Sequence, residues 1–178
     1  LLSLICGLLS PDEGTILLDD SPIQSPGQQG RIGYMLQKDH LFEWRTILSN
    51  TFLGPELLHT LTPSAKKEIS DMLATYGLGA FQHSRPSELS GGMRQRAALI
   101  RTLALKPELL LLDEPFSALD YQTRLSVCDD ISAIIRNAGK TAILVTHDLS
   151  EAISIADRII VLTRRPGRIK TIVPIHFS

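Results

Sequence analysis

The sequence has little of several features that mark particular classes of protein. Its two cysteines, Cys6 and Cys128, lack metal-ligand spacing and fall on apolar helical stripes, so we expect reduced core residues of a cytosolic protein. The 18 basic residues nearly balance the 19 acidic ones, which gives no electrostatic footprint for nucleic acid. No uninterrupted apolar run approaches the roughly 18 residues of a membrane span. The 178 residues suit one domain with its own core.

The first nine residues, LLSLICGLL, have no capping residue or initiator Met before them. Leu1, Ile5 and Leu8 recur at helical spacing, so we expect a helix with a buried stripe that the turn residues at 10–14 end. The first N–H groups of a helix need partners, and this stretch supplies none. The start also lacks the basic leader and the cleavage site of a signal peptide.

Strand and helix patterns alternate along most of the chain, with a loop rich in Pro, Gln, Ser and Gly at 19–30. The expected strands cover residues 14–18, 31–36, 109–113, 141–146, 158–163 and 168–175. The expected helices cover residues 46–58, 62–77, 91–105 and 121–139, and a short one begins at Asp148. This alternation indicates an α/β fold with a parallel sheet covered on both faces. The helical stretch between Gln37 and Leu89 interrupts the alternation and predicts an inserted helical subdomain.

Two adjacent acids follow the buried strand in LLLLDEP. Asp113 and Glu114 come at its carboxyl end, the edge where ligands of open α/β sheets gather. A Mg²⁺ ligand followed by a water-polarising base suits nucleotide hydrolysis. An ordinary acidic turn after a strand is the alternative.

The segment LSGGMRQR is expected to begin a helix whose start is suited to binding phosphate. Ser90 offers a capping hydroxyl, and Gly91 and Gly92 leave backbone N–H groups uncovered at the positive end of the helix. A plain N-cap with two flexible glycines fits the residues equally well.

Two further polar residues follow expected strands. In LVTHD, His147 comes at the same sheet edge as Asp113, a favourable place to contact a γ-phosphate, although a lone His more often has a packing or surface role. Gln37 ends another strand, and its amide could orient a water molecule or bind a metal.

Taken together and in order, GYMLQ, LSGGMRQRAALIRTLALKPELLLLDEPFSALD and ILVTHDLSEAISIADRIIVL resemble the ATP-binding subunits of ABC transporters. The resemblance covers nearly the whole chain. It implies that Gln37 is the Q-loop glutamine, which touches Mg²⁺ and water and senses the membrane partner. It also implies that Asp113 holds Mg²⁺ through water, that Glu114 is the general base and that His147 is the switch histidine.

The resemblance also assigns residues to contacts between two subunits. Ser90, Gly91 and Gly92 would form the signature that contacts the γ-phosphate of ATP held by the opposite subunit. The run SALD, which ends at Asp120, matches the D-loop that crosses the dimer interface. Met93 stands where many members of the family have Gln. It lies next to the phosphate-binding residues but is not one of them, so we expect little loss of function.

In this family, the pattern of the first residues directly follows the phosphate loop G-x-x-x-x-G-K-[ST]. We therefore expect a parent protein in which that loop precedes Leu1 and caps its helix, and a chain 1–178 that is inactive without it. The fold implied is a P-loop NTPase-like ABC nucleotide-binding domain with a mostly parallel sheet. Residues 1–36 and 106–178 would form its RecA-like core, and residues 37–105 the Q-loop, helical subdomain and signature helix.

The C-terminal run LTRRPGRIKTIVPI with LSGGMRQR looks most like the branch that imports nitrate, sulfonates and taurine, although RPGRI alone could be a basic turn. The resemblance implies ATP and Mg²⁺ as cofactors and a homodimer at the inner face of the cell membrane. Its partners would be an integral-membrane permease and, indirectly, an extracytoplasmic solute-binding protein, with no nucleic acid. A non-transport ABC ATPase of DNA repair or translation and a non-catalytic regulatory fragment are the alternatives.

We expect the segment between Gln37 and Arg85 to form the groove that receives a short cytoplasmic helix of the permease. Phe42, Trp44 and Leu53 are the candidate apolar contacts. For Phe42 and Leu53, a place in the subdomain core is an equally good interpretation.

Overall fold

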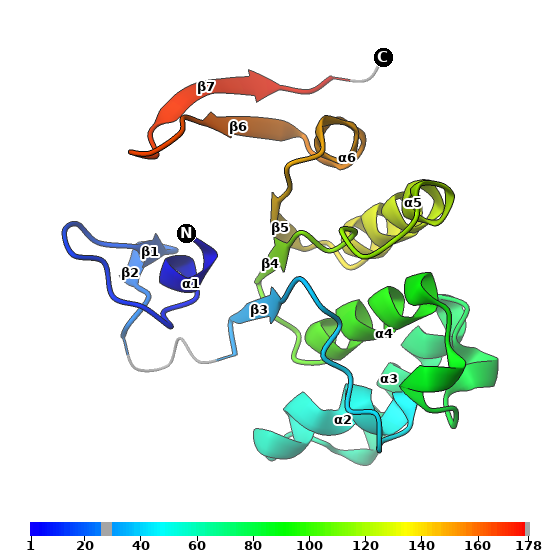
Figure 1. Cartoon of the computed structure of the whole chain (residues 1–178). Coiled ribbons are helices and arrows are strands. Elements are labelled where there is room, and N and C mark those ends of the chain that lie inside the picture. The colour runs from blue at the N-terminus through cyan, green and yellow to red at the C-terminus, as the bar shows by residue number, and fades with distance from the viewer. Residues whose placement is uncertain (26–29, 177–178) are drawn as a thin grey trace.

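The computed structural model describes residues 1–25 and 30–176 (Figure 1). The helices are α1 (Leu2–Ile5), α2 (Ile47–Leu57), α3 (Pro63–Thr75), α4 (Gly91–Leu103), α5 (Tyr121–Asn137) and α6 (Leu149–Ile155), with short 3₁₀ turns at Gly79–Phe81 and Pro86–Glu88. The strands are β1 (Leu17–Leu18), β2 (Ser21–Pro22), β3 (Ile32–Met35), β4 (Leu109–Asp113), β5 (Thr141–Val145), β6 (Arg158–Leu162) and β7 (Ile169–Pro174).

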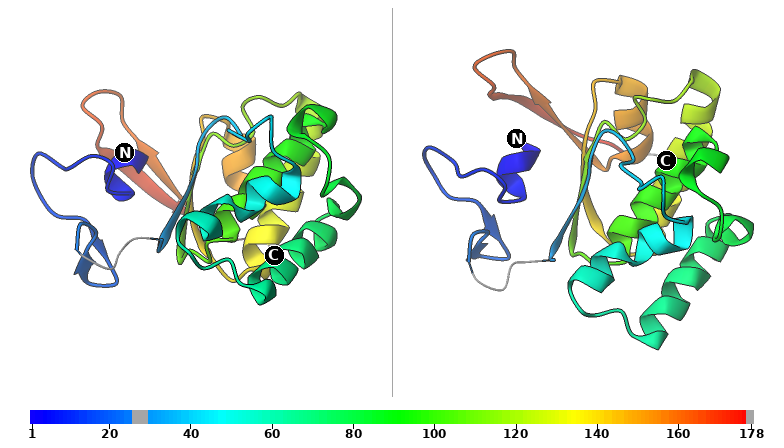
Figure 2. Two further views of the ribbon diagram at one scale, coloured as in Figure 1. Left: turned by 90° about the horizontal axis from the view of Figure 1, so that it is seen from below. Right: turned by 60° about the horizontal axis from the view of Figure 1, so that its bottom comes forward.

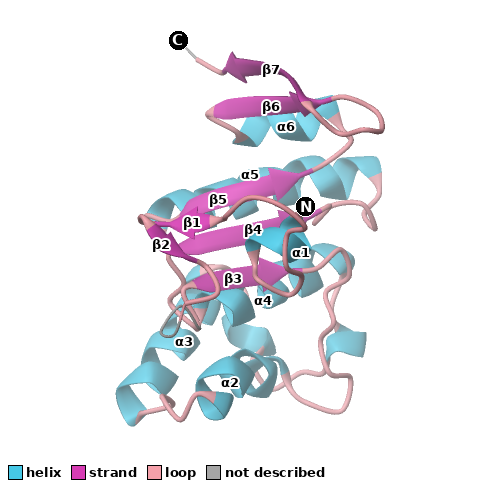
Figure 3. Cartoon of the chain, turned by 90° about the vertical axis from the view of Figure 1, so that its left-hand side faces the viewer, coloured by secondary structure: helices cyan, strands magenta, loops and turns pink. Residues whose placement is uncertain are grey.

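A parallel sheet in the order β3-β4-β5 lies at the centre, which confirms the α/β fold (Figure 3). In its register Met35 is opposite Leu112, and Asp113 is opposite Val145. The four leucines of β4 are buried, because this middle strand has a neighbour on each side and packing on both faces. All three strands therefore end at one edge of the sheet.

The main core lies between one face of this sheet and helices α4 and α5. Leu110 and Leu112 of β4 pack with a row of buried residues at 97–100 on α4 and with Ile131 and Ile134 of α5. The alternate residues Leu109 and Leu111 face the other side, where Leu2 of α1 covers them. The period of two along β4 thus divides the apolar side chains between two layers.

The helices expected over 46–58 and 62–77 are present as α2 and α3, which lie against α4 (Figure 2). Thr46 and Thr62 cap them by accepting hydrogen bonds from backbone N–H groups three residues later. Pro63 occupies the first position of α3, and Gly77 follows its end with a φ of 77°. Local capping chemistry therefore fixed both boundaries.

The expectation of a buried helical stripe over the first nine residues was wrong. Helix α1 has four residues, and Leu1 and Leu8 are 69% and 71% exposed. Gly7, with a φ of 75°, turns the chain away from the helix axis and leaves only Leu2 buried. The strand expected over 14–18 is the two-residue β1, which pairs with β2 inside the expected loop at 19–30. Residues 26–29 of that loop lie outside the described residues.

The last two strands are not part of the parallel sheet. β6 and β7 form a separate antiparallel pair, and no ladder joins β5 to β6 among the described residues (Figure 1). Both cysteines are free. Cys128 is buried as expected, whereas Cys6 is only partly buried.

Candidate functional site

Three predicted site residues meet at the carboxyl edge of the sheet. Gln37 Nε2 donates a hydrogen bond to Glu114 Oε2 at 3.1 Å, and His147 Nδ1 lies 3.2 Å from Glu114 Oε1. Gln37 follows β3, Glu114 follows β4 and His147 follows β5, so the parallel register brings them together. The Glu114 side chain is 30% exposed and that of His147 is 75% exposed, so the group opens to solvent.

The backbone around Glu114 is held in an unusual conformation. Glu114 has a φ of 44°, a left-handed conformation that costs a non-glycine residue about 1–3 kcal/mol. The Glu114 N–H donates to the carbonyl of Val145 at 2.9 Å, and the Ser117 hydroxyl donates to the carbonyl of Glu114 at 3.0 Å. The Ser117 hydroxyl also accepts a bond from Gln37 at 3.4 Å. Contacts from the ends of β3 and β5 therefore support the strained turn that positions the Glu114 carboxylate.

Asp113 has a different set of contacts from its neighbour. Its Oδ2 accepts a hydrogen bond from the Tyr34 hydroxyl at 3.1 Å. Partial burial and the nearby carboxylate raise the pKa of Tyr34, so it stays a neutral donor at physiological pH. Sequence reasoning missed Tyr34. The only sequence signal was the alternation of side chains along a strand, which places Tyr34 and the buried Met35 on opposite faces of the sheet.

The chemistry of Asp113 suits Mg²⁺, which prefers hard oxygen ligands and keeps several waters beside one or two carboxylates. In residues 1–25 and 30–176 there is no group of three or more His, Cys, Asp or Glu residues placed to hold a metal ion. Gln37, also predicted to touch the metal, donates its amide N–H groups to Glu114 and Ser117.

The predicted signature stands at the start of α4. Ser90 caps the helix, its Oγ accepting from the N–H of Met93 at 3.3 Å. Both glycines are closely packed: a Cβ on Gly91 would lie 2.9 Å from Leu119 Cδ2, and one on Gly92 would lie 2.6 Å from Val127 Cγ2. Among the described contacts, no hydrogen bond joins these three residues to Glu114.

Asp120 caps α5, its Oδ1 accepting from the N–H of Thr123 at 3.1 Å. Hydrogen bonds from Thr123 lower the pKa of this exposed carboxyl. One turn later, Arg124 donates to the carbonyl of Leu119 at 3.0 Å and to Asp148, which caps α6, at 3.2 Å. Arg124 thus ties the predicted D-loop segment to Asp148, the residue that follows His147. Sequence reasoning missed it, since one arginine on an exposed helix pattern gives no signal.

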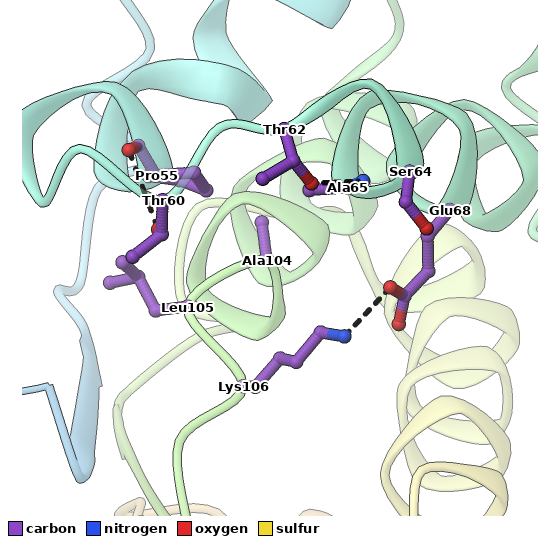
Figure 4. Close-up of a pocket in the computed structure, with 9 residues that line it drawn as sticks. All are labelled: Pro55, Thr60, Thr62, Ser64, Ala65, Glu68, Ala104, Leu105 and Lys106. Atoms are coloured by element: carbon purple, nitrogen blue, oxygen red, sulfur yellow. Dashed lines mark hydrogen bonds and ion pairs between the residues drawn. The ribbon is translucent and has the colours of Figure 1, made fainter.

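A cavity of about 320 Å³ lies elsewhere, between the α2–α3 connection and the end of α4 (Figure 4). Thr60 and Thr62 line it together with Lys106 and Glu68, which form an ion pair at 2.7 Å. None of the predicted site residues reaches it, so the candidate site is the sheet edge together with the start of α4.

A parallel sheet with an acidic pair, a Gln and a His at its carboxyl edge defines a P-loop-type nucleotide-binding domain. The family model described as ABC transporter matches residues 1–117, and the chain belongs to this family as an ATP-binding domain. The structure has a TM-score of 0.76 and 27% identity to the "dimeric structure of a post-hydrolysis state of the ATP-binding cassette MJ0796 bound to ADP and Pi". That match covers 99% of this chain and 80% of the other.

Curated relatives give the same result. The chain is 49% identical over 173 residues to the uncharacterized ABC transporter ATP-binding protein YtlC of Bacillus subtilis, covering 97% of this chain and 65% of that protein. It is 44% identical over 179 residues to MJ0412 of Methanocaldococcus jannaschii, covering 100% and 66%. It is 38% identical over 178 residues to the taurine import ATP-binding protein TauB of Yersinia pestis, covering 100% and 69%. The chain thus spans about two thirds of the length of these relatives.

Proposed function

We propose that the parent protein is the ATP-hydrolysing subunit of an ABC importer, with Glu114 as the general base. The observation that carries the proposal is the contact of Glu114 with both Gln37 and His147. A base needs a fixed carboxylate within reach of water, and two hydrogen-bonding groups from neighbouring strands hold this one at a solvent-accessible edge.

In the mechanism we propose, Glu114 accepts the proton of the water that attacks the γ-phosphate. The Gln37 amide orients that water as well as the carboxylate, since it already donates to Glu114 Oε2. His147 lies against the other carboxylate oxygen, where it can donate a hydrogen bond to the γ-phosphate once nucleotide separates the pair. When bound beside Asp113, Mg²⁺ would neutralise phosphate charge.

The signature supports a proposal of a homodimer. Ser90, Gly91 and Gly92 begin a 13-residue helix, and they make no described hydrogen bond to Glu114. A helix start of this kind favours an anion, so we propose that it contacts the ATP of a second copy, with Asp120 at the same interface. The solved relative is described as dimeric, which supports this arrangement.

The relatives support a finer proposal for the cargo. The Yersinia protein is named as a taurine import ATP-binding protein, so we propose a small anion such as taurine, another sulfonate or nitrate.

No helix in the described part of the chain is long and apolar enough to cross a membrane. We propose that a permease holds the subunit at the cytoplasmic face of the membrane and that a solute-binding protein acts on the far side.

Replacing Glu114 with Gln tests the proposed function. In the parent protein, Glu114→Gln keeps the shape of the side chain but removes the proton acceptor. We expect hydrolysis to fall at least about 100-fold while ATP binding remains. Glu108→Gln is the matched control, because Glu108 precedes the other end of β4 and pairs with Arg31. Near-normal phosphate release by the Glu114→Gln protein would refute the assignment.

Trp44 supports a docking site for the permease. It is 72% exposed, and its ring centroid lies 4.8 Å from that of Phe42, which is partly buried, as is Leu53. We expect Trp44→Cys to cross-link to a cysteine on a short cytoplasmic helix of the permease. Tyr121→Cys, at an aromatic side chain of 70% exposure on α5, is the control and should not cross-link. Cross-linking at Tyr121→Cys without cross-linking at Trp44→Cys would show that the permease does not dock at Trp44.

A further inference from the structure

Two arginines of α4 hold the segment that follows Gln37. Arg94 Nε donates to Asp39 Oδ2 at 2.8 Å, and Arg94 Nη2 donates to Asp39 Oδ1 at 3.2 Å and to Glu43 Oε1 at 2.7 Å. Two helical turns later, Arg101 donates to the carbonyls of His40 at 2.6 Å and Asp39 at 2.7 Å. Side chain and backbone of this segment are therefore both attached to one face of the helix.

The Asp39 side chain is the centre of this attachment. It is 19% exposed and also accepts a hydrogen bond from the N–H of Leu41 at 3.0 Å. Partial burial would raise the pKa of Asp39, but the hydrogen bonds from Arg94 and Leu41 outweigh it and the pKa lies below its usual value. Asp39 is therefore charged at neutral pH, when its two-point bond with the guanidinium is strongest.

The attachment joins two functional segments over a short length of chain. Asp39 is two residues after Gln37, whose amide contacts Glu114. Arg94 is two residues after Gly92, the last residue of the signature. No other described ion pair links the segment at 38–44 to α4. Any displacement of this segment must therefore move α4 or break these bonds.

We propose that Arg94 and Asp39 form a latch that makes the segment after Gln37 and the signature helix move as one body. This proposal rests on the proposed function, in which the chain's own ATP is sensed at Gln37 and its signature serves the ATP of a second copy. The latch then couples the two ATP sites of the dimer, since ATP at one site fixes the helix that completes the other. Bending is confined to Leu36–Lys38, between β3 and the latch.

The test measures cooperativity and local opening separately. In the parent protein, we expect the Hill coefficient for MgATP hydrolysis to fall from near 2 to about 1 in Arg94→Met, with the maximal rate changing much less. Arg94→Lys keeps the charge without the two-point bond and should give an intermediate value. Asp39→Asn should lower the Hill coefficient less than Arg94→Met does, because Arg94 keeps its bond to Glu43 in that variant. The double variant should match Arg94→Met, because without the guanidinium the Asp39 change removes nothing further from the latch.

The second measurement is hydrogen exchange of the 178-residue chain. The amides at 39–43 should exchange at least about fivefold faster in Arg94→Met, with the β4 amides unchanged. Arg96→Met is the matched control: Arg96 is on the same helix, has similar exposure and instead pairs with Asp130 of α5 at 2.9 Å. It should leave both readouts at wild-type values.

The outcomes separate the two proposals. Absence of MgATP hydrolysis in the wild-type parent protein would overturn the proposed function, while hydrogen exchange would still test the latch. A wild-type enzyme with a Hill coefficient of 1, or an unchanged coefficient in Arg94→Met, would overturn the coupling. Unchanged exchange at 39–43 in Arg94→Met would overturn the latch itself.

Discussion

The central sheet and the C-terminal β6–β7 hairpin contain similar residues but differ greatly in burial. All four leucines of β4 are buried, whereas every residue of β7 is exposed and Ile160 and Leu162 of β6 are about half exposed. β4 pairs with a strand on each side and has helices on both faces, while β6 and β7 pair only with each other in the described structure (Figure 1).

This difference indicates that the apolar composition of a segment specifies its pairing as a strand but not its burial. A run such as RIIVL forms a strand in either setting, since β-branched side chains suit a pleated surface. Its contribution to stability depends on which elements cover it. The candidate site lies at the carboxyl edge of the covered sheet, so its geometry rests on the better-packed of the two regions.

The largest expected effect contrasts one leucine from each region. Leu110→Ala removes a fully buried side chain between the sheet and the helices, and we expect the free energy of unfolding to fall by about 2–5 kcal/mol. Leu162→Ala, at a side chain of 51% exposure on β6, should change it by about 0.5 kcal/mol or less. Denaturant unfolding of the 178-residue chain, followed by circular dichroism, measures both. Equal losses would mean that the hairpin is covered in solution.

The same contrast explains which features could be predicted from the sequence. Gln37, Glu114 and His147 each follow an apolar strand, so parallel pairing alone was enough to place them at one edge. The caps of α3, α4 and α5 were predictable because capping is local chemistry.

Contacts between distant segments could not be predicted in this way. The pairing of Asp39 with Arg94 joins positions 55 residues apart, and that of Tyr34 with Asp113 joins positions 79 apart. Neither pair has a sequence pattern that distinguishes it from ordinary surface charges or strand aromatics. The helical spacing of the first nine residues was misleading because Gly7 ends α1 after its first turn.

An intermediate effect concerns the glycines of the signature. In Gly92→Ala the new Cβ would lie 2.6 Å from Val127 Cγ2, so we expect a loss of about 1–3 kcal/mol in the free energy of unfolding. Gly167→Ala is the control, since a Cβ added there would have no neighbouring atom within 4 Å. Adding Val127→Ala should recover part of the loss. Unchanged thermal stability in Gly92→Ala would show that packing does not require a glycine at this position.

The smallest expected effect is the pH dependence of Asp39. Its pKa is lower in the folded chain than the ordinary value of about 3.9, so its contribution to stability is present above that value and is lost as the pH falls through the folded pKa. At pH 7, Asp39→Asn should lower the free energy of unfolding by about 1 kcal/mol or less, because Arg94 keeps its bond to Glu43.

The difference between wild type and Asp39→Asn should be constant from pH 5 to 8 and shrink as the pH falls below about 4. Denaturant unfolding over this range measures it. The Arg94→Met background supplies the control, because without the guanidinium the carboxyl loses the main interaction that lowers its pKa. A pH dependence that survives in that background would assign the effect to the other two groups that lower this pKa, the Leu41 amide and the Arg101 guanidinium.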